Sequence, residues 1–276
     1  MMTATTAATT AAGARRSGAV FARSVVERRR FAILVGGGVG AFGFLFSLMY
    51  ESMRESLAEL TEGLPEAILA MIGDTDMASA TGWLNGELYS LTAPGAVLVV
   101  AIIAAGHALP GEEERQTMGL LLANPVSRRE VVVQKAAALV VHVVVAAGLI
   151  TFGTVVGAVV AGLDVSAAGF VGVTLHLIAL GVAFGGVALA VGALLGRRRR
   201  TMGVTAGLAV AAYAAASFFP LNPDLAGWAE VSPWWYYQSS TPLANGTDIG
   251  HVIVLALLGV VATAVAVWGF QRRELA

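Results

Sequence analysis

Six long stretches of the chain are almost entirely apolar, and the shorter stretches between them hold nearly all of the charge. The apolar stretches fall near residues 31–49, 93–110, 132–162, 169–195, 201–219 and 249–270. Each comes close to or exceeds the ~20 residues that a helix needs to cross the ~30 Å hydrocarbon core of a bilayer. None alternates polar and apolar residues as membrane-spanning strands do. The pattern predicts an all-α integral membrane protein with six transmembrane helices.

Composition supports this fold class. The chain has 276 residues, of which 57% are hydrophobic and 13% charged, with a mean hydropathy of +0.77. A soluble domain carries about 25% charged residues. There is no cysteine, which excludes disulfides and thiolate metal sites. Residues 1–14 are small and of low complexity, so we expect a disordered leader there and a single six-span membrane domain over residues 15–276.

The charges are sorted by side. If the N-terminus is cytoplasmic, each of the 17 Lys and Arg residues except Arg54 lies on the inner side, while most of the 18 acidic residues lie outside. Because Lys and Arg near span ends concentrate in the cytoplasm, this sorting predicts that both termini are cytoplasmic. The basic segment before residue 31 predicts either an amphipathic helix in the membrane interface or plain flanking charge.

Glycines spaced four residues apart recur within the apolar stretches. The pairs are Gly36 and Gly40, Gly153 and Gly157, Gly181 and Gly185, Gly192 and Gly196, and Gly203 and Gly207. This spacing predicts close contact between helices. A Trp- and Tyr-rich stretch before the last span is expected along the outer leaflet, because such side chains favour the level of the headgroups.

The spans lack the residues of several function classes. They hold no Asp, Glu or Arg, and their one Lys, Lys135, lies near the inner boundary. This argues against ion-coupled secondary transport, which relies on ionisable groups in mid-membrane. The chain has no P-loop, no nucleophile elbow and no zinc-protease motif. We therefore expect no catalysis, no bound metal and no nucleic-acid partner, and any ATP-driven work must come from another chain.

Two histidines leave a different function open. His142 and His176 lie well inside the third and fourth apolar stretches. Buried histidines on neighbouring helices can ligate a haem, which would make the chain a membrane haem-binding or electron-transfer subunit. The alternative is that each imidazole hydrogen-bonds a neighbouring helix.

Most of the remaining chemistry lies between the second and third spans, in GEEERQTMGLLLANPVSRREVVVQK, residues 111–135. After Pro110-Gly111, residues 112–123 predict a helix of about three turns with acidic residues at its N-terminus, where the helix dipole favours them. Met118, Leu121 and Leu122 share one face of that helix, and the acidic residues share another. Such a helix can lie flat under the membrane.

The helix is predicted to stop at Asn124-Pro125, because the residue before a proline avoids the helical region. Ser127 and Glu130 have the spacing of a capping box at the start of span three. Arg128, Arg129 and Lys135 are expected as anchors at the inner interface. At 31 residues, span three exceeds the bilayer core, so its inner end should project into the cytoplasm with the short helix. An ordinary inter-span loop is the alternative.

This segment closely resembles the one between the second and third spans of type-2 ATP-binding-cassette (ABC) permeases, in which an acidic start with Arg, a Leu-rich stretch, Pro-hydrophobic-Ser-Arg and a downstream Lys occur together. The basic segment before span one is similar to that family's interfacial elbow helix. The stretch SPWWYYQSSTPLANG and the closing FQRREL are similar to its C-terminal pattern. One departure is that Gln116 and Met118 stand where Gly and Leu are more usual.

The resemblance implies a permease subunit of an ABC transporter, with export the expected direction, in the cell membrane. It implies a homodimer or heterodimer with a second permease, a cytoplasmic ABC ATPase as partner, contact with membrane lipid, and ATP and Mg bound by the ATPase rather than by this chain. It also implies that residues 112–123 form the coupling helix. The residues implied to bind the ATPase are Glu112, Glu113, Glu114 and Arg115 by polar contacts, and Met118, Leu121 and Leu122 as apolar anchors.

Overall fold

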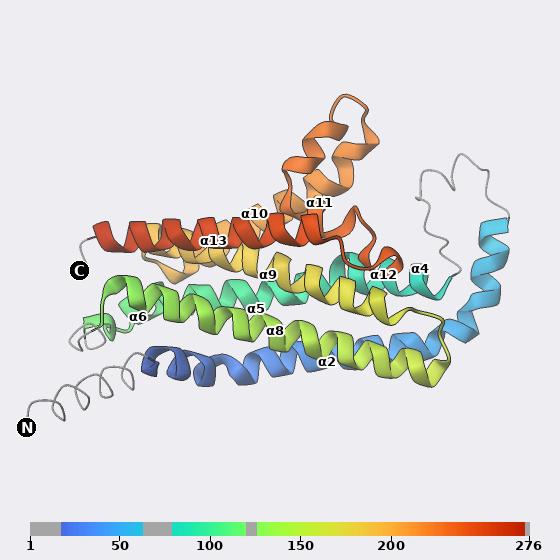
Figure 1. Cartoon of the computed structure of the whole chain (residues 1–276), viewed down its shortest axis with the longest axis horizontal. Helices are drawn as coiled ribbons and strands as arrows, with labels where there is room; N and C mark the ends of the chain where they lie inside the picture. The colour runs from blue at the N-terminus through green and yellow to red at the C-terminus, as the bar shows by residue number, and fades with distance from the viewer. Residues whose placement is uncertain (1–17, 63–78, 120–125, 274–276) are drawn as a thin grey trace, which may run out of the picture.

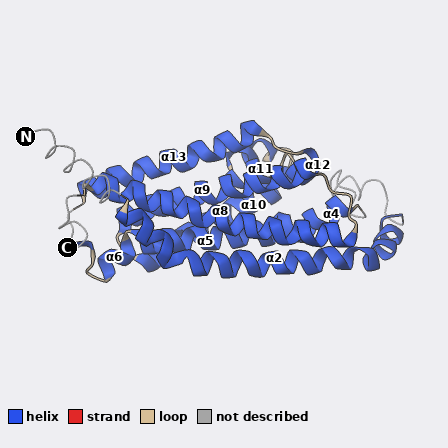
Figure 2. Ribbon diagram, turned by 60° about the horizontal axis from the view of Figure 1, so that its bottom comes forward, coloured by secondary structure: helices blue, strands red, loops and turns tan. Residues whose placement is uncertain are grey.

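The computed structural model describes residues 18–62, 79–119 and 126–273, and the regular elements in these ranges are helices (Figure 2). Six of them are long and apolar enough to cross a membrane, which confirms the predicted fold class. The elements that form the spans are α2 (Ala19–Glu62), α4 (Ala80–Leu84) with η1 (Asn85–Thr92) and α5 (Ala93–Ala108), α8 (Arg128–Ala161), α9 (Ala167–Leu195), α10 (Arg198–Phe218) and α13 (Ile249–Arg272). The predicted disordered leader lies outside the described residues.

The first span is a single helix of 44 residues. A separate elbow helix before residue 31 was predicted, and within residues 19–30 this is wrong, because those residues are the first turns of α2. No Gly or Pro interrupts VVERRRFAIL, so nothing there breaks the helix. These turns also bind α8: the Phe21 N–H donates to the Gln134 side-chain oxygen at 2.9 Å, and a His142 ring nitrogen lies 3.1 Å from the Val25 carbonyl.

Helices α2 and α8 lie side by side in both views (Figures 1 and 2), and glycines bring their backbones together. A Cβ atom at Gly36 would lie 2.7 Å from Ala146 Cα, and one at Gly157 would lie 2.7 Å from Phe44 Cα, closer than real Cβ atoms come. This confirms the prediction of close packing for the first two glycine pairs. At Gly203 and Gly207 on α10 an added Cβ would meet nothing within 4 Å, so the same spacing does not mark a packed contact there.

Helix α9 is the centre of the bundle. It is the most buried of the six spans and packs against α5, α8, α10 and α13. Its glycines admit the side chains of neighbours, with Gly181 against Val97 and Val143 and Gly185 against Leu139. Leu177 and Leu180 are completely buried. Helices α10 and α13 therefore pack directly on α9, whereas α2 joins this core through α8 and α5.

Short elements follow α10: η2 (Phe219–Leu221), η3 (Ala226–Val231), α11 (Pro233–Gln238) and α12 (Pro242–Asn245). In Figure 1 the orange part of this region projects from the bundle beside α11. The aromatic residues divide between two environments, because Trp234 and Tyr237 are buried whereas Trp228 is 64% exposed. Part of the aromatic stretch thus belongs to the protein core rather than to a surface.

The first turns of α2, the last turns of α13 and the short helix α6 (Pro110–Glu114) lie together at one end of the bundle (Figure 1). We call this the inner end, and the opposite end, which holds α4, α11 and α12, the outer end. The charge sorting of the sequence predicts that the inner end is cytoplasmic.

Candidate functional site

Helix α6 follows span two directly at the inner end. Pro110 occupies its first turn, where a missing backbone N–H costs nothing and the fixed φ suits the helix. Glu112 and Glu113 also lie in the first turn, where the positive end of the helix dipole favours them. We call Glu112, Glu113 and Glu114 the glutamate turn.

The helix predicted over residues 112–123 is not continuous, because α6 ends at Glu114 and Gln116 has a positive φ of 56°. The end has the two bonds of a Schellman motif: the Thr117 N–H donates to the Glu112 carbonyl at 3.0 Å, and the Gln116 N–H donates to the Glu113 carbonyl at 2.9 Å. Helical backbone starts again at Met118. Gln116 therefore occupies the left-handed position that favours glycine.

Glu112 is buried and ion-paired within its own chain. Its Oε1 lies 3.1 Å from Lys135 Nζ, and the two side chains are 9% and 4% exposed. Its Oε2 accepts a hydrogen bond from the Thr117 hydroxyl. Burial acts to raise the pKa of Glu112, but the Thr117 hydrogen bond and the charge of Lys135 outweigh it, so the pKa lies below its usual value. Glu112 thus stays ionised and holds α6 against α8.

Glu113 reaches the end of span six. Its carboxylate pairs with Arg273 at 2.5 Å, and Arg273 also donates to the Ala193 carbonyl at the end of α9. From α8, Arg128 donates to the carbonyls of Phe270 and Arg273 at 3.2 and 2.7 Å. The inner ends of α8, α9 and α13 are therefore joined to α6 through these two arginines.

Glu114 reaches span five. Its Oε1 accepts a hydrogen bond of 2.9 Å from the Arg198 backbone N–H, which is an unpaired amide of the first turn of α10. A carboxylate at this point is favoured by the helix dipole. Three consecutive glutamates thus bind residues of α8, α10 and the end of α13.

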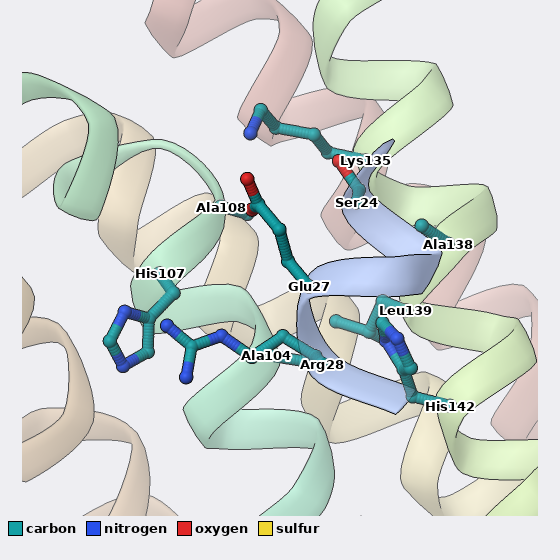
Figure 3. Close-up of a pocket in the computed structure, with 10 residues that line it drawn as sticks. All are labelled: Ser24, Glu27, Arg28, Ala104, His107, Ala108, Lys135, Ala138, Leu139 and His142. Atoms are coloured by element: carbon teal, nitrogen blue, oxygen red, sulfur yellow. The ribbon is translucent and has the colours of Figure 1, made fainter. Parts of the chain in front are cut away.

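A small polar cavity of about 20 Å³ lies beside the glutamate turn, between α2, α5 and α8. In Figure 3 the Glu27 carboxylate points toward Lys135, and the Arg28 guanidinium lies beside the His107 ring. The volume is that of about one water molecule, which is too small for a cofactor. The cavity therefore belongs to the polar packing around Lys135.

The model of the ABC-2 family transporter protein matches residues 21–275. The chain belongs to the ABC-2 transporter family. No curated protein matches it at a significant level. The match covers all six spans and the glutamate turn, so the chain is a multi-pass ABC-2 permease subunit of the membrane.

The structure places the predicted site residues of this ABC-2 permease in two groups. Glu112, Glu113 and Met118, expected on the surface that meets the ATPase, face their own bundle; Met118 is 4% exposed. Glu114 and Arg115 are exposed, as expected of contact residues. Leu121 and Leu122 lie outside the described residues. Binding of the ATPase by any of these residues stays a prediction.

The residues at the start of span three are also divided. Ser127 caps α8, accepting a hydrogen bond from the Glu130 N–H at 3.1 Å, which confirms half of the capping box; the return bond from Glu130 stays a prediction. Arg129 is exposed. Lys135, expected at the membrane interface, is instead buried with Glu112. The reason is that this turn of α8 faces α6, whose Glu112 pairs with Lys135 at 3.1 Å.

The two histidines of the haem alternative have separate environments. A His142 ring nitrogen lies 3.1 Å from the Val25 carbonyl on α2, and a His176 ring nitrogen lies 2.8 Å from the Gly172 carbonyl on its own helix. Within the described residues, no group of three or more His, Cys, Asp or Glu could hold a metal ion. The geometry gives the haem alternative no support.

Sequence reasoning missed Arg273 and Thr117. Arg273 lies 160 residues from Glu113, and its only signal is that the last span ends on two arginines. Thr117 gave no signal, because its hydroxyl is aligned with Glu112 only when the chain turns at Gln116.

Proposed function

We propose that this ABC-2 permease exports its substrate across the cell membrane with energy from ATP hydrolysed by a separate cytoplasmic ATPase, which binds the ATP and Mg. Two permease domains, identical or paralogous, complete the transporter. The glutamate turn transmits the movement of the ATPase to the spans.

One observation carries this proposal: the turn that joins spans two and three holds α8, α10 and α13 at once, through Lys135, Arg198 and Arg273. The charge sorting of the sequence favours a cytoplasmic position for this end. A protein without a nucleotide-binding motif needs such a contact to receive work from another chain. Because only Leu109 separates α6 from span two, that work reaches four spans.

Glu112 and Glu113 are ion-paired within their own chain, so the exposed surface left for the ATPase on this turn is Glu114, Arg115 and the residues that follow. Arg115 is exposed at the end of α6. An exposed arginine at the edge of an interface recognises carboxylates by paired hydrogen bonds. Because Glu114 already binds the Arg198 amide, we assign to Arg115 the main polar contact among the four residues that the resemblance implies.

The test reverses this charge. Arg115→Glu should lower permease-stimulated ATP hydrolysis by about tenfold, because a like-charge contact at an interface costs more than a lost one. The measurement uses permease and ATPase co-reconstituted in lipid nanodiscs, at matched amounts of folded permease. Arg54→Glu is the control, since Arg54 is an exposed arginine at the outer end. Equal stimulation by both variants would contradict the docking role.

A further inference from the structure

At the outer end, α11 binds two spans through side-chain hydroxyls. The Ser232 hydroxyl at its N-cap donates to the Ala212 carbonyl of α10 at 2.6 Å. The Tyr237 hydroxyl donates to the Tyr89 carbonyl of η1 at 2.6 Å, and both tyrosines are at most 2% exposed. Helix α11 is thus a bridge between span five and span two.

The element that Tyr237 binds is a π-helix of eight residues, η1. A π-helix joins each carbonyl to the N–H five residues on, and it is rare and often found at functional positions. Its last bond runs from the Ala93 N–H to the Leu88 carbonyl. The next donor in the series would be residue 94, which is Pro94 and has no N–H. The Tyr89 carbonyl is therefore left without a backbone donor.

In an α-helical register the unpaired carbonyl would be a different one. The Ala93 N–H would then donate to Tyr89, and the carbonyl opposite Pro94 would be that of Ser90. The Tyr237 hydroxyl meets the Tyr89 carbonyl, so its bond is needed only in the π register. Burial raises the pKa of Tyr237 well above 10, and the hydroxyl therefore remains a donor.

We propose that Tyr237 is a positioning residue that selects the π register at the outer end of span two by binding the carbonyl that Pro94 leaves open. A buried carbonyl without a partner is costly, so the hydroxyl favours the one register in which it supplies the missing donor. Without it, the shorter bonds of an α-helix become the better arrangement for residues 85–92.

The register fixes how the outer end of span two meets span one. Trp83 in α4 stacks on Phe46 of α2 with ring centroids 4.3 Å apart, and its Nε1–H donates to the Phe46 carbonyl at 3.1 Å. One residue of register turns a helix by about 100°. A change at η1 would therefore move Trp83 away from Phe46 and separate α4 from α2.

The part that this choice plays in transport rests on the proposed function. Span two leads directly into the glutamate turn, where Glu114 binds the first amide of α10. Helix α10 binds Ser232, and Tyr237 returns the connection to η1. Together with the chain itself, these bonds form a closed ring of contacts that includes both ends of the bundle. The ring runs through α5, α6, α10, α11 and η1. Tyr237 is where this ring fixes the outer end of span two.

The register is measurable on the purified chain alone. Because the sequence has no cysteine, two introduced cysteines can be labelled specifically. Spin labels at Glu87→Cys, an exposed residue of η1, and at Val160→Cys, 64% exposed at the outer end of α8, report one distance. Tyr237→Phe should shift this distance by roughly 5 Å or more, because the labelled turn rotates. Tyr236→Phe removes a neighbouring hydroxyl and should leave the distance unchanged. An unchanged distance in folded Tyr237→Phe protein overturns the proposal.

A second measurement tests the role of Pro94. Pro94→Ala supplies an N–H to the open carbonyl in either register. In the Pro94→Ala background, Tyr237→Phe should therefore lower Tm by less than about half of the loss that it causes in the unmodified chain. Such coupling is expected only of residues that share a partner. Equal losses of Tm in both backgrounds would overturn the claim that Pro94 and Tyr237 act on the same carbonyl.

ATP-driven transport should fall in Tyr237→Phe. Unaltered transport with a shifted distance would contradict the role in transport, and no transport by the unmodified protein with its ATPase would contradict only the proposed function.

Discussion

At the inner end, Glu112 and Glu113 bind Lys135 and Arg273 as ion pairs, whereas at the outer end hydroxyls of α11 bind the backbone carbonyls of α10 and η1. The inner contacts come from consecutive residues of one turn, so a single displacement reaches several spans. The outer contacts come from the two ends of one short helix and fix a register. Under the proposed function the inner contacts move as a unit, while the outer contacts hold one geometry of η1.

The two chemistries respond differently to the loss of a partner. A buried charge that loses its counter-ion remains buried and unpaired, which costs far more than the net value of the pair. A neutral hydroxyl bond is worth about 0.5–1.5 kcal/mol. Removing one residue should therefore damage the inner end most.

The largest effect is expected at Lys135. Lys135→Ala leaves the Glu112 carboxylate buried without its cation and should lower the free energy of unfolding by about 3–5 kcal/mol. Thermal unfolding in nanodiscs measures it. Arg23→Ala is the control, because the Arg23–Glu27 pair is exposed, at 62% and 39%, and should cost at most about 1 kcal/mol. Similar losses in both variants would mean that Lys135 is not a buried, paired charge.

Acid provides a smaller test of the same pair. The pKa of Glu112 is lower in the folded chain than its ordinary value of 4.5. The stability it contributes is therefore present above pH 4.5 and is lost as pH falls through the folded pKa. Glu112→Gln should be less stable than the unmodified chain at neutral pH, and the difference should shrink on acidification, measured as Tm against pH. The label distance at η1 should not change over this range, since Tyr237 stays protonated. If the difference in Tm between the two proteins stays the same as pH falls, Glu112 does not contribute to the loss of stability in acid.

The spans were predictable and the bonds between them were not. Hydropathy is local, so each apolar stretch identifies its own helix, and the Ser127 cap needs only the three residues that follow it. The partners of the glutamate turn depend on which helix ends meet, and Arg273 and the Arg198 amide come together only in the folded bundle. The continuity of α2 was missed because basic residues before a span are compatible both with a separate interfacial helix and with the first turns of the span itself. The contact of Phe21 with Gln134 on α8, which favours the second arrangement, forms only in the folded bundle.

The break at Gln116 shows the limit most clearly, and it supports the smallest prediction. An L-residue at φ 56° costs roughly 1–2 kcal/mol, and glycine removes that cost while adding about 0.4–1 kcal/mol of unfolded-state entropy. Gln116→Gly should thus raise the free energy of unfolding by about 0.5–1 kcal/mol. Gly162 caps α8 at φ 67° with nothing within 4 Å of an added Cβ, so Gly162→Ala at the outer end should show the opposite sign. Chemical unfolding of both variants in mixed micelles measures the pair. A loss of stability in Gln116→Gly would mean that the glutamine side chain, rather than the backbone, determines the turn. Gln116, which departs from the family pattern, would then stabilise the inner end.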